Sequence, residues 1–68
     1  MSGMVNLIEL SPGMRIRVAN GGTAEVVENP KDGMWVIARY VTSPEDPAQV
    51  GQEEMVFAQD VVGIVEGE

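Results

Sequence analysis

The chain has 68 residues and a formal net charge of −7, and this length predicts a single domain. It contains neither cysteine nor histidine, which excludes disulfides, thiol chemistry and the usual zinc and histidine acid–base sites. The acidic balance also argues against duplex nucleic acid as the main ligand, because neutralising phosphates supplies most of that affinity. A core this small is thin, so support from oligomerisation is common.

The N-terminal run MVNLIEL, residues 4–10, is apolar but far too short to span a bilayer. It also lacks the basic flank of a signal peptide, so we expect a cytoplasmic protein that makes no membrane contact. The pattern leaves open whether residues 1–9 form a loose arm or a short strand. The main domain is expected over residues 10–66, with residues 67–68 as a frayed tail.

Short apolar runs separated by glycine and proline follow, and none has a sustained helical period. This pattern predicts an all-β protein. The expected elements are strands at 14–19, 23–28, 34–42 and 53–58, a 3-10 turn at 59–62 and a closing strand at 63–66. Met14 and Met55 are assigned to the core, where methionine often fills gaps.

In the strand 14–19, apolar residues alternate with Arg15 and Arg17, which indicates one buried face and one charged face. A three-residue loop at 20–22 with a glycine bulge pairs Arg17 with Glu25 and leaves apolar residues facing apolar residues. A two-residue loop would mix the two faces, so the three-residue loop is preferred.

The third strand, MWVIARYVT, is apolar on both faces. A five-residue turn, NPKDG, pairs it with the second strand so that Val26 faces Val36. Three alternate residues then point inward, namely Val36, Ala38 and Tyr40. Two large apolar residues remain on the outer face, namely Trp35 and Ile37.

Five short strands with a 3-10 turn before the last one resemble the SH3-like five-stranded small barrel. The segments LSPGMRIRVANGG, TAEVVENPKDGMWVIARY and MVFAQDVVGIVE match the layout of stand-alone SH3-like, KOW-like and Tudor-like domains. In outline the chain is also similar to the family of small SH3-like accessory subunits that includes the acceptor-side subunit of photosystem I, through VIARY and VFAQDVV. The resemblance implies a fold and carries no activity, because one fold hosts many functions.

The outer face of the first three strands is the predicted binding surface. Its residues are Trp35, Ile37, Val27, Arg15, Arg17 and Arg39. Exposed apolar clusters usually mark interaction sites, and tryptophan and arginine are enriched at their energetic centres. Two alternatives stay open: Trp35 belongs to the core, or the N-terminal run or the closing strand covers this face.

These observations predict a non-enzymatic protein-interaction module or small accessory subunit, whose partner could be another copy of the chain. The first alternative is a single-stranded nucleic-acid binder in which Trp35 stacks on a base and the arginines contact phosphates. The second is a structural component of a larger assembly.

No catalytic residue is assigned, because the hydroxyl side chains have no histidine to activate them and so small a domain offers no cleft for paired carboxylates. No metal or cofactor is expected, because the acidic residues around the loop SPEDPAQVGQEE lack the spacing of a calcium loop.

Overall fold

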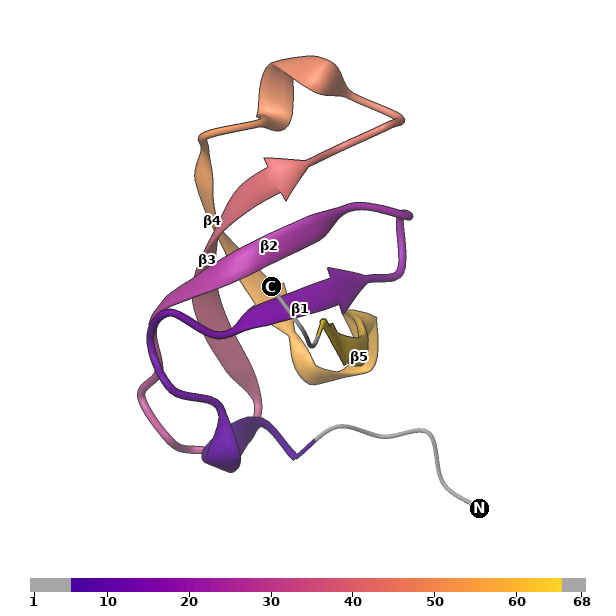
Figure 1. Ribbon diagram of the computed structural model, residues 1–68. Coiled ribbons are helices and arrows are strands. Elements are labelled where there is room, and N and C mark those ends of the chain that lie inside the picture. Colours follow the sequence, from indigo (N-terminus) through magenta and orange to yellow (C-terminus); the bar gives the residue numbers. More distant parts are fainter. Residues whose placement is uncertain (1–5, 66–68) are drawn as a thin grey trace.

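One five-stranded antiparallel sheet, with strand order β4-β3-β2-β1-β5, makes up the fold (Figure 1). The computed structural model describes residues 6–65. The strands are β1 (Arg15–Val18), β2 (Thr23–Glu28), β3 (Trp35–Thr42), β4 (Glu53–Phe57) and β5 (Val61–Val65). Three short 3-10 turns accompany them, namely η1 (Leu7–Glu9), η2 (Pro47–Gln49) and η3 (Ala58–Asp60). The all-β prediction is therefore confirmed.

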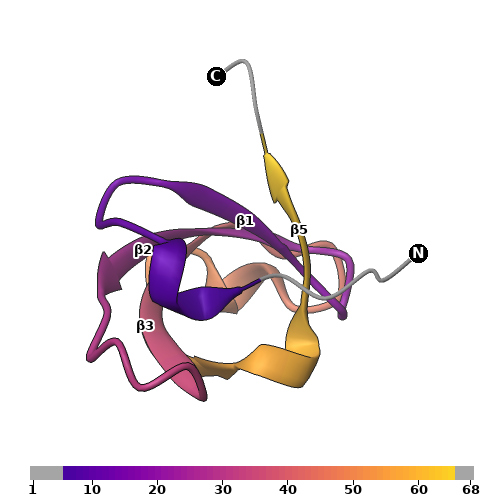
Figure 2. The ribbon, with the colours of Figure 1, turned by 90° about the horizontal axis from the view of Figure 1, so that it is seen from below.

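The sheet is strongly curved, so that β1 and β2, β3, and β5 surround a common interior (Figure 2). Within the described residues β4 and β5 are the two edges of the sheet, and η3 connects them along the chain. The predicted strands agree with the observed ones to within two residues. The expected tail at residues 67–68 and the first five residues of the expected arm lie outside the part of the chain that the structure describes.

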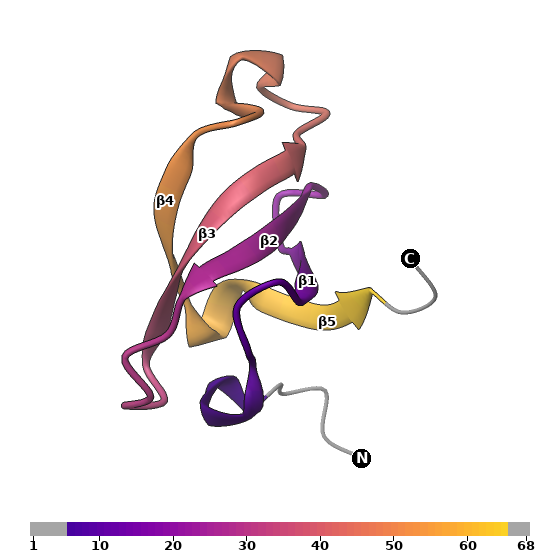
Figure 3. The ribbon, with the colours of Figure 1, turned by 60° about the vertical axis from the view of Figure 1, so that its left-hand side comes forward.

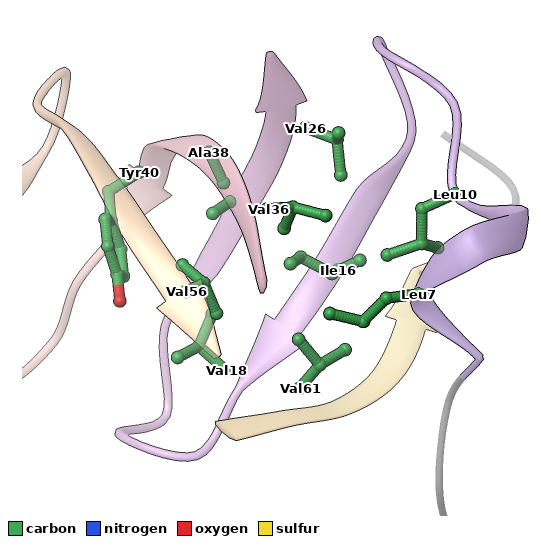
Figure 4. Close-up of a cluster of buried hydrophobic side chains, with 11 residues drawn as sticks. Leu7, Leu10, Ile16, Val18, Val26, Val36, Ala38, Tyr40, Val56 and Val61 are labelled. Atoms are coloured by element: carbon green, nitrogen blue, oxygen red, sulfur yellow. The ribbon is translucent and has the colours of Figure 1, made fainter. Parts of the chain in front are cut away.

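The interior is lined by one alternate set of residues from each strand, together with two leucines from the N-terminal segment. The buried apolar residues are Leu7, Leu10, Ile16, Val18, Ala24, Val26, Val36, Ala38, Tyr40, Val56 and Val61. Tyr40 lies at one end of this cluster, and Leu7 and Leu10 lie at the other (Figure 4). The prediction that Val36, Ala38 and Tyr40 point inward is confirmed.

One core assignment is wrong. Met55 is 48% exposed, whereas Met14 is partly buried and packs against the core as expected. Side chains of a strand alternate between its two faces, and Val56 occupies the inner position of β4. Met55 is therefore directed to the outer face.

The first hairpin has the predicted three-residue loop with a glycine bulge, one residue earlier than expected. The amide of Val18 donates to the carbonyl of Gly22 at 2.9 Å, and the amide of Gly21 donates to the carbonyl of Val18 at 2.9 Å. Gly21 has a φ of +92°, the left-handed conformation that this bulge requires. Gly22 is needed for space, because a Cβ there would lie 2.5 Å from the carbonyl oxygen of Thr42.

This earlier turn moves the pairing of β1 with β2 by two residues. Glu25 faces Arg15, and the expected pairing of Glu25 with Arg17 is wrong. The pairing of β2 with β3 also differs by two residues, because Val26 faces Ala38 and not Val36. A slip of two residues keeps every side chain on its own face, so the inner and outer sets are unchanged.

The second hairpin differs because its turn is wider than five residues and because an irregularity interrupts β2 after Val26. Asn29 does not pair with β3, and its side chain bonds to the N-terminal segment. Its amide nitrogen donates to the carbonyl oxygens of Leu7 and Leu10, both at 2.7 Å. These bonds hold the N-terminal segment against the sheet.

The N-terminal segment therefore contributes to the core. Its described part forms the turn η1, which begins with a hydrogen bond from the amide of Ile8 to the side chain of Asn6 at 3.1 Å. Leu7 and Leu10 are essentially inaccessible to solvent. In the view from below, η1 lies across one end of the curved sheet (Figure 2).

Candidate protein-interaction surface

Four apolar residues from β3 and β4 lie side by side on the outer face of the sheet. Trp35 is directly opposite Phe57, and Ile37 is directly opposite Met55. Directly opposed residues of an antiparallel pair share one face and lie close enough for their side chains to contact. These four residues are called the outer patch below, and Figure 3 shows the two strands that carry it running side by side.

The outer patch is accessible to solvent. Phe57 is 47% exposed and Met55 is 48% exposed, while Trp35 and Ile37 are half-buried. The next outer pair along the two strands is charged, namely Arg39 with Glu53, so the apolar surface consists of the two neighbouring pairs. This is the arrangement of an unpartnered apolar contact surface.

The six residues predicted from the sequence are divided by the structure into two groups. Trp35 and Ile37 belong to the outer patch, and Val27 lies half-buried on β2, at the irregularity that places Ile37 opposite Glu28. The other group consists of the three arginines, Arg15, Arg17 and Arg39. Arg15 and Arg39 contribute to a different feature of the same face.

Charges of alternating sign form a row across four strands. Arg15 on β1 faces Glu25 on β2, Glu25 also faces Arg39 on β3, and Arg39 faces Glu53 on β4. The Arg39 guanidinium donates to the Glu53 carboxylate at 2.8 Å. Most of the positive charge predicted for the binding surface is therefore matched by carboxylates on the same face.

Arg17 lies outside this row. It is exposed and is paired with Thr23 on one side and Gly63 on the other. Two strands separate β1 from β4 in the sheet, so Arg17 is distant from Phe57 and Met55 in the strand order.

Phe57 and Met55 are the surface residues that sequence reasoning missed. The signal was present in β4, where the alternation of EEMVF allows only one of Met55 and Val56 to point inward. Phe57 is two residues after Met55, so it lies on the same outer face.

Carboxylates gather at the end of the sheet where Tyr40 closes the core. Burial raises the pKa of the Tyr40 hydroxyl, the charges of Glu54 and Asp60 raise it further, and a hydrogen bond with the Asn20 side chain lowers it. Burial is the largest of these causes and Glu54 the next. Glu54 and Asp60 are therefore the carboxylates that act on the Tyr40 hydroxyl.

The long loop between β3 and β4 is folded back onto β4 by a chain of side-chain hydrogen bonds. Ser43 donates to Gln49 at 2.8 Å, and the amide of Gln49 donates to the carboxylate of Glu54 at 3.0 Å. Glu45 and Asp46 are exposed on the same loop. The described contact between this loop and the start of β4 is therefore made by Gln49.

Within residues 6–65, no three acidic side chains converge in a way that could hold a metal ion. The same part of the chain contains no helix with the length and apolar character needed to cross a membrane. No family model, curated protein or solved structure matches the chain.

Proposed function

We propose that the protein is a small, non-enzymatic interaction module or accessory subunit that binds another protein through the outer patch. The observation that carries this proposal is the pairing of half-buried Trp35 with exposed Phe57 and of half-buried Ile37 with exposed Met55. Aromatic residues and methionine are enriched at the centres of protein interfaces. A domain this small gains little stability from an apolar surface that remains in water.

The architecture supports an SH3-like small barrel as the scaffold. In sequence order the last strand returns to lie beside the first, and a 3-10 turn directly precedes it. The curvature of the sheet around one core agrees with this interpretation (Figure 2). On such a scaffold the outer face of β3 and β4 is a rigid platform.

The charge arrangement favours a protein partner over single-stranded nucleic acid. Stacking on Trp35 would need free cations nearby to meet phosphates. The guanidinium nearest to the outer patch along β3, that of Arg39, already binds Glu53 at 2.8 Å. A structural component of an assembly would use the same surface. It differs from an interaction module only in the lifetime of the complex that it forms.

The test compares two pairs of substitutions with similar exposure. Met55→Ser with Phe57→Ser removes half of the outer patch, and Val62→Ser with Ile64→Ser removes exposed apolar residues of β5. The partner is cross-linked to the chain in its source cells, identified and purified, and its affinity is then measured by calorimetry. We expect the first pair to weaken binding at least about tenfold and the second to leave it unchanged.

The fluorescence of Trp35, the single tryptophan, provides a second measurement. Addition of the purified partner should protect Trp35 from quenching by acrylamide. Equal affinities for wild type and for the β4 pair of substitutions, with Trp35 still accessible, would show that the outer patch is not the binding surface.

A further inference from the structure

The backbone of β4 has one side that no described strand occupies. At the two ends of the β3–β4 ladder, the amide of Tyr40 donates to the carbonyl of Gln52 at 3.0 Å, and the amide of Ala58 donates to the carbonyl of Met34 at 2.8 Å. Hydrogen-bonded and non-hydrogen-bonded pairs alternate along an antiparallel ladder. Glu54 and Val56 are therefore the residues of β4 whose backbone groups bond to β3.

The remaining residues of β4, Glu53, Met55 and Phe57, direct their amide and carbonyl groups away from β3. Since β4 is an edge of the sheet, these groups face the side on which a further strand would add. All three residues are exposed. The edge thus offers donors and acceptors at three regularly spaced positions.

The other edge, β5, is less suited to strand addition. Its pairing with β1 is regular only until Arg17, where a register shift leaves Val62 without an opposite residue. Bulges twist an edge and discourage further pairing. The pairing of β4 with β3 is uninterrupted from Glu53 to Phe57.

Met55 and Phe57 supply both outward backbone groups and two of the four outer patch side chains. A strand laid along β4 would place the residues opposite Met55 and Phe57 on the outer face, next to the apolar side chains. Main-chain hydrogen bonds would then provide affinity, and alternate side chains would provide specificity.

The charge around β4 identifies the occupant. β4 carries Glu53, which pairs with Arg39 of β3, and Glu54, which is exposed. Residues 40–65 as a whole contain five acidic residues and no lysine or arginine, namely Glu45, Asp46, Glu53, Glu54 and Asp60. A second copy fits poorly, because each copy carries −7 and a two-fold pairing centred on Met55 would set Glu53 against Phe57 of the other copy. A basic segment complements this edge.

We propose that β4 accepts an extended segment of a partner protein as a sixth strand. The segment carries large apolar residues opposite Met55 and Phe57, which recur with a period of two. It also carries a lysine or arginine next to Glu54, because the carboxylate of Glu53 already pairs with Arg39. The inference rests on the proposed function, because it names the partner chemistry of the outer patch.

The probe is a display library of random twelve-residue peptides, selected against the full chain. We expect enrichment of sequences in which apolar residues alternate with other residues and a basic residue lies at one end. A selected peptide is then synthesised, and its affinity for the wild type and for two variants of Met55 is measured by fluorescence anisotropy. A library that yields no binder, or binders without basic residues or with helical spacing, overturns the proposal.

The two variants separate backbone pairing from side-chain contact. Met55→Val keeps an apolar side chain and the outward amide, and Met55→Pro removes that amide. Proline is tolerated on edge strands where the amide faces away from the sheet. We expect Met55→Pro to weaken binding at least tenfold more than Met55→Val does, because both variants shorten the side chain and only proline removes the amide.

If Met55→Pro does not fold, amide exchange in the wild-type complex replaces it. Peptide binding should slow the exchange of the Met55 and Phe57 amides, and unchanged exchange overturns strand addition. Peptide binding that survives Met55→Pro but is lost with Met55→Ser and Phe57→Ser overturns strand addition and leaves the proposed function standing.

Sedimentation of the chain without peptide tests whether a second copy of the chain, and not a basic segment, pairs with β4. A wild type that sediments as a dimer, with Met55→Pro sedimenting as a monomer, assigns β4 to a second copy and overturns the basic segment. A wild type that stays monomeric and binds the selected peptide supports the proposal.

Discussion

The two faces of β3 have similar composition and opposite environments. Its inner residues Val36 and Ala38 are completely buried, and Tyr40 is 5% exposed. Its outer apolar residues Trp35 and Ile37 are half-buried and lie opposite Phe57 and Met55 of β4. Hydrophobicity alone therefore does not identify the core of this strand. The inner face is enclosed by the curved sheet, and the outer face has no second layer within residues 6–65.

The contrast is sharper within β4. Val56 is 3% exposed, and its two neighbours Met55 and Phe57 are about half exposed. Val56 is apolar because it is part of the core. The core does not explain why Met55 and Phe57 are apolar. Under the proposed function, stability and binding are carried by opposite faces of the same two strands, so substitutions should affect them separately.

The largest expected effect is on the stability of the inner face. Ile16→Ala removes a completely buried side chain and should lower the free energy of unfolding by about 3 kcal/mol. The matched change on the outer face, Ile37→Ala, should cost about 1 kcal/mol, because less apolar area returns to water. Urea unfolding of both variants measures the difference, and equal losses would contradict the division between the two faces.

A smaller effect is expected from the pH dependence that Tyr40 contributes. The pKa of this hydroxyl is raised in the folded protein, chiefly by burial and then by Glu54, whereas in the unfolded chain it titrates near its ordinary value of about 10. The unfolded state therefore loses the proton first, and the stability contributed by the neutral hydroxyl is lost as the pH rises above that value.

Urea unfolding at several pH values from 8 to 11 tests this prediction. The midpoint for the wild type should fall more steeply above pH 10 than the midpoint for Tyr40→Phe, which has no hydroxyl to titrate. Parallel curves for the two proteins would show that Tyr40 does not contribute to the loss.

The smallest effect is expected from the ion pair on the outer face. Both side chains of the Arg39–Glu53 pair are 48% exposed, and pairs of this kind contribute only a few tenths of a kcal/mol. A double-mutant cycle with Arg39→Gln and Glu53→Gln should give a coupling of that size, weakened further by salt. A coupling as large as the cost of Ile37→Ala would place part of the stability on the outer face.

Much of the fold followed from alternation in the sequence. The period of two in MRIRV and TAEVVE, and the parity of Val36, Ala38 and Tyr40, identified the strands and their inner faces. These assignments were unaffected by errors of two residues in both hairpins. A shift of two preserves the face of every side chain, whereas a shift of one would have buried Glu25.

The tertiary structure decided what alternation leaves open. The partner of Glu25 depends on which glycine adopts the left-handed conformation, and this glycine is Gly21. The second turn is wider than expected, so the Asn29 side chain can bond to Leu7 and Leu10 at the end of the core. The outer patch likewise exists only because β4 pairs with β3 in one register, which places Met55 and Phe57 beside Ile37 and Trp35. Local sequence determines which face of a strand is apolar, because that depends on chain geometry alone. Which faces meet, and which one stays open to a partner, depends on contacts between residues far apart in the chain.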